Sequence, residues 1–91
     1  MIFIREGRKY DTETSTLIYE HVTSSEHSLG YTETLYRSAK NNHYAIREEE
    51  EGANTTYDIK FLPKKDVSIW LDKRNAPESA YAACDIEIEE A

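Results

Sequence analysis

The chain has 91 residues and a formal net charge of −7, because 18 aspartates and glutamates outnumber 11 lysines and arginines. A field of that sign repels nucleic acid and anionic membranes, and it attracts cationic protein surfaces. A chain of this length forms one domain with one modest core, to which seven tyrosines and one tryptophan bring apolar area. The lone Cys84 excludes an intramolecular disulfide, and the apolar start at residues 1–4 is too short for a signal peptide. We therefore expect an ordered, soluble, intracellular protein.

The first half of the chain predicts antiparallel strands. Residues 2–4 and 8–10 flank the turn signal Glu6-Gly7, which indicates a hairpin. Residues 17–22 predict a strand, and the polar residues 23–30 predict a mobile loop. Residues 31–50 predict a second hairpin with Asn41-Asn42 as its two-residue turn, because asparagine tolerates the positive φ that such turns require.

That turn fixes the expected register of the second hairpin. It places four apolar side chains on the core face of the sheet: Leu35, Ala39, Tyr44 and Ile46. Tyr36 and Arg47 are then expected to pair on the other face. The acidic run that follows, residues 48–51, is expected to form an exposed loop, since successive like charges are unfavourable in a packed element.

The second half of the chain predicts one more strand and two helices. Residues 55–61 alternate apolar and polar side chains, as a half-buried strand does. After Pro63, the helical spacing of Val67, Trp70 and Leu71 indicates a helix to about residue 74. Residues 75–84 predict a short second helix with Tyr81 and Cys84 on one side, and residues 84–91 predict an edge strand or a flexible acidic tail.

The expected fold class is therefore α+β, in a single domain spanning residues 1–91. An antiparallel sheet of four to five strands, from about residue 17 to residue 61, should be covered by the C-terminal helices.

No catalytic or cofactor motif is present in the sequence. The spacing of His21, His27 and His43 matches no compact zinc pattern. The three glycines are too scattered for a phosphate-binding loop, and no nucleophile elbow occurs. We expect no catalytic residue, no metal and no cofactor, although two carboxylates of a small hydrolase stay possible.

The acidic runs are the candidate contacts to a partner. Carboxylates repeating along a strand can occupy a groove where basic side chains would otherwise meet phosphates, although solvation of a small domain is an equally good reading. Tyrosine favours interfaces because it offers large amphipathic area at low entropic cost. The candidate partner-binding residues are Glu48, Glu49, Glu50, Glu51, Tyr36, Asp85, Glu87, Glu89 and Glu90.

Three stretches resemble a family of small uncharacterised proteins of bacterial phages and other mobile elements. Residues 7–14 (GRKYDTET) are similar to a K-x-Y-D-T-x-T opening, residues 33–37 (ETLYR) to an E-x-L-Y hairpin, and Trp70-Leu71 to a W-L-containing helix. The resemblance spans about residues 7–75. The chain departs from the family at residues 50–53, where a glycine-richer segment is common, and at Lys64-Lys65, where a helix cap is expected.

The resemblance implies mobile DNA as the origin and a bacterial cytoplasm as the location. Short acidic proteins of such elements are often inhibitors of host defence, including anti-CRISPR proteins. We therefore expect a protein-binding inhibitor whose acids block the basic surface of a nucleic-acid-handling protein such as a CRISPR effector, with no direct nucleic-acid or membrane binding. The alternatives are a homodimeric structural or regulatory module, joined through Ile86 and Ile88, and the carboxylate-dependent hydrolase.

Overall fold

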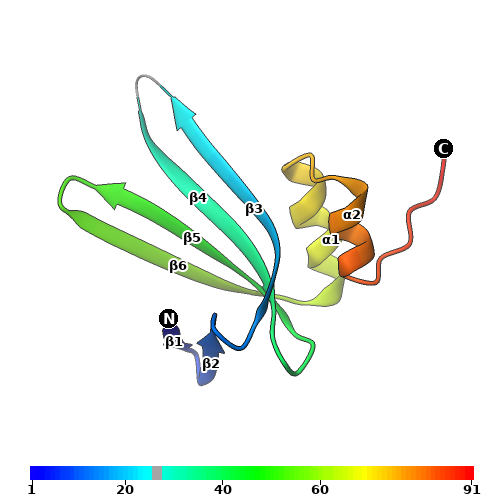
Figure 1. The fold of residues 1–91 in the computed structure, drawn as a ribbon, viewed down its shortest axis with the longest axis horizontal. Helices are drawn as coiled ribbons and strands as arrows, with labels where there is room; N and C mark the ends of the chain where they lie inside the picture. The colour runs from blue at the N-terminus through cyan, green and yellow to red at the C-terminus, as the bar shows by residue number, and fades with distance from the viewer. Residues whose placement is uncertain (26–27) are drawn as a thin grey trace.

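The computed structural model describes residues 1–25 and 28–91 and has the expected α+β architecture (Figure 1). The hairpin of β1 (Ile2–Arg5) and β2 (Arg8–Asp11) precedes a four-stranded antiparallel sheet of order β3-β4-β5-β6. The strands of that sheet are β3 (Thr16–Ser25), β4 (Ser28–Arg37), β5 (His43–Glu51) and β6 (Asn54–Leu62). The helices α1 (Lys64–Lys73) and α2 (Glu78–Ala83) follow, so the predicted elements over residues 2–10 and 55–83 are confirmed.

The sheet has a core on each of its faces, because side chains alternate along a strand. On the helix face, Leu35, Ala45 and Leu62 pack against Val67, Trp70 and Leu71 of α1 and against Ala80 of α2. On the hairpin face, Tyr10 and Phe3 of the hairpin pack against Tyr44, Ile46, Tyr57, Ile59 and Phe61. The helices lie beside one end of the sheet, and the strand pairs β3–β4 and β5–β6 extend away from them (Figure 1).

The first hairpin turns as the sequence predicts. Arg5 pairs with Arg8, which leaves Glu6 and Gly7 as a two-residue turn with φ of 52° and 78°. Positive φ at both central residues matches the right-handed twist of the flanking strands, and glycine adopts it without a Cβ clash.

The predicted register of the second hairpin is wrong. Arg37 pairs with His43, so residues 38–42 form a five-residue connection in which only Asn41 has a positive φ, of 64°. The connection is closed by hydrogen bonds from the Ser38 amide to the Asn42 carbonyl (2.8 Å) and from the Asn42 amide to the Ser38 hydroxyl (3.1 Å). The register differs from the expected one by an odd number of residues, and an odd shift moves side chains to the opposite face.

The shift changes which side chains share a face. Leu35 lies on the helix face opposite Ala45, whereas Tyr44 and Ile46 lie on the hairpin face. Tyr36 pairs with Tyr44, and the two rings stack with centroids 5.3 Å apart. The expected pair of Tyr36 with Arg47 does not form, and Ala39 is exposed in the connection.

Both predicted loops in the sheet are wrong. Strand β3 continues to Ser25 and β4 starts at Ser28, so residues 23–25 and 28–30, expected in a mobile loop, belong to strands. Residues 26 and 27, the centre of that loop and the position of His27, lie outside the described residues. The four glutamates at 48–51 belong to β5, where alternation sends neighbouring carboxylates to opposite faces and so separates their charges.

The C-terminal tail forms no edge strand. Ile86 donates its backbone N–H to the carbonyl of Tyr81 (3.0 Å) and packs on the helix-side core, and residues 86–91 have no regular secondary structure. In residues 1–25 and 28–91, no helix is long and apolar enough to cross a membrane.

Candidate functional site

One part of the hairpin face is uncovered, and it combines acids with apolar side chains. The β1–β2 hairpin packs over β5 and β6, while Leu17 and Val22 of β3 are 52% and 62% exposed. Pairing of β3 with β4 aligns Leu17 with Tyr36, Glu20 with Thr34, and Val22 with Thr32. Thr32 in turn pairs with Glu48 of β5. We call this surface the acidic sheet face and define it by Leu17, Glu20, Val22, Tyr36, Glu48 and Glu50.

Two tyrosines close to these acids, Tyr36 and Tyr57, have raised pKa values. Burial raises the pKa of Tyr36, and the charges of Glu20 and Glu48 raise it further. The pKa of Tyr57 is raised by loss of solvent, by the charge of Glu48, and by the hydrogen bond that its hydroxyl donates to Glu48 Oε1 (3.4 Å). Both phenols therefore stay protonated at neutral pH and can donate hydrogen bonds.

The acidic sheet face also lacks compensating cations within the sheet. At the described positions of β3–β6, the cationic side chains Arg37, Arg47 and Lys60 alternate to the helix face. On the hairpin that packs over this face, the Arg5 guanidinium lies 5.8 Å from the ring centroid of Phe3. Carboxylates on a sheet face without cations create the kind of field that attracts a basic surface.

The structure brings together only three of the nine predicted contacts: Tyr36, Glu48 and Glu50. Glu49 and Glu51 lie on the helix face, where Glu49 forms an ion pair with Arg47 (Oε1 to Nε, 2.5 Å). The Arg47 guanidinium also stacks 3.8 Å above the Tyr31 ring, so Glu49 has a cationic partner within the chain that Glu48 and Glu50 do not share.

The acids of the tail lie at the other end of the molecule. The connection between β5 and β6 and the C-terminus mark opposite ends of the long horizontal axis of Figure 1. Asp85, Glu87, Glu89 and Glu90 are exposed there, beyond α2. The two acidic runs therefore form two separate surfaces rather than one.

Sequence reasoning missed Glu20, Leu17 and Val22 as members of the acidic sheet face. Their strand was predicted, but its pairing with the next strand was not, so no local signal placed Glu20 on the same sheet face as Glu48. The signal that was available is the alternation of Leu17, Glu20 and Val22 with residues of the other face, once the bulge at Ile18 is included.

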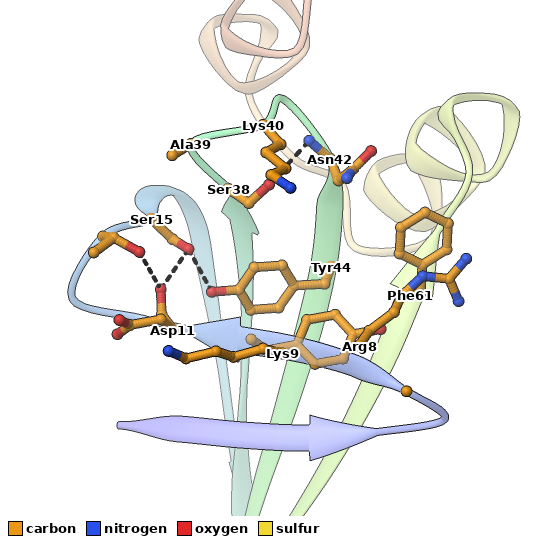
Figure 2. A pocket seen from close by; sticks show the side chains of 13 residues that line it. Arg8, Lys9, Asp11, Ser15, Ser38, Ala39, Lys40, Asn42, Tyr44 and Phe61 are labelled. Atoms are coloured by element: carbon orange, nitrogen blue, oxygen red, sulfur yellow. Dashed lines mark hydrogen bonds between the residues drawn. The ribbon is translucent and has the colours of Figure 1, made fainter.

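A second feature is a depression between the hairpin, the 38–42 connection and the end of β6 (Figure 2). Its volume is about 580 Å³, and its lining includes three cations, Arg8, Lys9 and Lys40. Asp11 supplies the one carboxylate among the described lining residues. On one side, the Ser15 hydroxyl donates to the Asp11 carbonyl (2.7 Å) and lies 2.6 Å from the Tyr44 hydroxyl.

A third, smaller cavity of about 130 Å³ contains two buried titratable groups, His43 and Cys84, and is also lined by Lys64 and Asp85. Burial lowers the pKa of His43, with further lowering from the charges of Arg37 and Lys64 and an opposing effect of Asp85. Burial raises the pKa of the Cys84 thiol. Both side chains are therefore uncharged at neutral pH, and the His43 Nε2 atom has no hydrogen-bond partner among the described residues.

The lowered pKa of His43 predicts a loss of stability in mild acid. A group whose folded pKa lies below its unfolded value of about 6.5 contributes stability above pH 6.5, and that contribution is lost as the pH falls through the folded pKa. Urea unfolding between about pH 7.5 and pH 5.5 should therefore show a larger loss for the wild type than for His43→Gln. Equal losses in the two proteins would show that His43 is not the group that titrates.

Among the described residues, no three histidine, cysteine, aspartate or glutamate side chains gather closely enough to hold a metal ion. A scan against protein-family models, a search of curated proteins and a search of solved structures each found no match to this chain.

Proposed function

We propose that this chain is a protein-binding inhibitor, and that its acidic sheet face covers the nucleic-acid-binding surface of a basic partner. The observation that carries the proposal is the exposure of Leu17 and Val22 on the same sheet face as Glu20, Glu48 and Glu50. Apolar side chains supply affinity when they are buried at an interface, while negative charges at its rim steer the encounter with a cationic surface.

The partner class follows from the chemistry of this face. Carboxylates at alternate positions of a strand, such as Glu48 and Glu50, repeat about every 6.6 Å on one face, and they can meet lysines and arginines that otherwise contact phosphates. We propose a nucleic-acid-handling protein of bacterial defence as the partner, and a CRISPR effector within that class. The support is the net charge of −7 together with the resemblance of residues 7–75 to small proteins of mobile DNA.

A pair of matched variants tests this proposal. One variant carries Glu20→Gln, Glu48→Gln and Glu50→Gln, and the control carries Glu87→Gln, Glu89→Gln and Glu90→Gln, so that each loses three negative charges. The immobilised proteins are exposed to a bacterial lysate at about 0.1 M and about 1 M salt, where the screening length falls from about 10 Å to about 3 Å. Any retained protein is purified and assayed for nucleic-acid binding in the presence of the chain.

We expect the wild type and the tail control to retain a nucleic-acid-binding protein at low salt only, and to inhibit its binding of nucleic acid. The sheet-face variant should associate at least tenfold more slowly, because charges at the rim act mainly on the association rate. If both variants lose binding equally, net charge rather than this face is responsible. If a partner is retained but its nucleic-acid binding is unaffected, the inhibitory role is wrong.

A further inference from the structure

The depression beside Tyr44 is opposite in charge to the rest of the molecule. The chain as a whole has 18 acidic and 11 basic side chains, yet three cations and one carboxylate line this depression. Arg8, Lys9 and Lys40 against Asp11 give a local charge of +2 on a protein whose net charge is −7. A concave site lined mainly by one sign of charge attracts ligands of the opposite sign, here anions.

The three cations come from two elements and line different sides of the depression. Figure 2 shows Lys9 on one side of the hairpin, Arg8 on the other beside Phe61, and Lys40 above them on the 38–42 connection. The Arg8 guanidinium lies 4.0 Å from the Phe61 ring centroid, a cation–π contact that restricts the position of its planar fork. Arginine held in this way loses less conformational entropy when it binds an anion.

The floor of the depression is rigid and its hydroxyl groups are already oriented. Tyr44 is almost completely buried and packs against the Tyr10 ring, with centroids 4.9 Å apart. Because the proton of the Ser15 hydroxyl is used by the Asp11 carbonyl, the Tyr44 hydroxyl donates its own proton to Ser15. Burial raises the pKa of Tyr44, so the hydroxyl stays neutral and adds no negative charge to the depression.

We propose that this depression binds a small phosphate monoester, with the phosphate among the cations Arg8, Lys9 and Lys40 and the organic part on the Phe61 side. A local charge of +2 matches a phosphate dianion better than a single carboxylate. The volume of about 580 Å³ exceeds what inorganic phosphate needs and lies within the range of small-ligand pockets, about 300–1,000 Å³. This site uses side-chain cations and does not need a glycine-rich phosphate loop. It is independent of the acidic sheet face.

Calorimetric titration of the full chain with three probes tests the proposal: AMP, adenosine and inorganic phosphate. We expect AMP to bind, inorganic phosphate to bind at least tenfold more weakly, and adenosine not to bind in the millimolar range. Comparable affinities for AMP and inorganic phosphate would show a simple anion site, and binding of adenosine as tight as that of AMP would show that the phosphate is not recognised. Absence of AMP binding at millimolar concentration would overturn the proposal.

Variants locate the site. Lys40→Ala and Lys9→Ala each remove one exposed cation and should each weaken AMP binding about tenfold, since a hydrogen bond to a charged group is lost. Lys60→Ala is the matched control, because Lys60 is an exposed lysine on the opposite face of the sheet. Heteronuclear NMR of each variant verifies the fold. If Lys60→Ala weakens AMP binding as much as Lys40→Ala, binding is nonspecific and the site is wrong.

Discussion

Replacement of Trp70 by alanine is expected to lower the free energy of unfolding by about 3–5 kcal/mol. Trp70 is 7% exposed at the centre of α1, where its ring meets the Tyr19 ring edge to face at 6.4 Å and the Arg74 guanidinium at 3.9 Å. Truncating a buried tryptophan costs about 3–5 kcal/mol, because apolar area is lost and a cavity remains. Domains of this size are stable by only about 5–15 kcal/mol, so the variant should be partly unfolded at modest urea concentrations.

Urea unfolding followed by circular dichroism measures this loss, since the variant lacks the only tryptophan. Ile69→Ala is the control on the same helix, because Ile69 is 50% exposed and should change the free energy of unfolding by less than about 0.5 kcal/mol. The m-values should agree if only stability changes. A Trp70→Ala variant as stable as Ile69→Ala would contradict the packing of α1 on the sheet.

The helices, strands and turns that could be predicted from the sequence are those specified by a pattern of nearby residues. The helix over residues 64–73 follows from the spacing of Val67, Trp70 and Leu71, and the strand over residues 54–62 from strict alternation. The first hairpin follows from Glu6-Gly7, because glycine favours a tight turn. Both residues have the positive φ that a two-residue hairpin turn requires. In each case the pattern lies within about ten residues and needs no knowledge of the partner element.

The register of β4 and β5 was not predictable in the same way. Two asparagines suggested a two-residue turn, but the Ser38 side chain and backbone both bond to Asn42 and close a longer connection. Serine and asparagine bond to nearby backbone in many turns, so the sequence alone does not decide between the two lengths. That choice controls the candidate site, because it places Tyr36 on the face of Glu48 rather than opposite Arg47.

The acidic run at residues 48–51 shows why like charges do not always exclude a strand. We expected a loop because electrostatic repulsion between adjacent carboxylates would destabilise a packed element. In β5, however, successive carboxylates point alternately to the two faces of the sheet. Glu48 receives a hydrogen bond from Tyr57, and Glu49 an ion pair from Arg47, so the two half-buried carboxylates have partners. Tyr57 is the cross-strand neighbour of Glu48, and Arg47 lies two residues before Glu49 on the same face of β5, so neither partner is visible from counting charges.

Among changes to charged side chains, breaking the ion pair between Glu33 and Arg74 is expected to lower the free energy of unfolding most. This pair joins β4 to the end of α1. Two hydrogen bonds form it, from Arg74 Nε to Glu33 Oε1 (3.1 Å) and from Nη2 to Oε2 (2.6 Å), while Nη1 donates to the Trp70 carbonyl (2.9 Å). The side chains of Arg74 and Glu33 are only 17% and 10% exposed. Breaking such a pair leaves a buried charge without a partner, at a cost of about 3–5 kcal/mol.

A double-mutant cycle with methionine separates that cost from lost packing. Arg74→Met should lower the free energy of unfolding by about 3–5 kcal/mol, because the Glu33 carboxylate is left buried and unpaired. Glu33→Met should cost less, since Arg74 keeps its bond to the Trp70 carbonyl and its contact with the Trp70 ring. The double variant should recover most of the loss, because well-packed apolar side chains often replace a buried ion pair without penalty. Urea unfolding of the four proteins gives the coupling energy, and additive losses in the double variant would mean that the two side chains do not stabilise the fold as a pair.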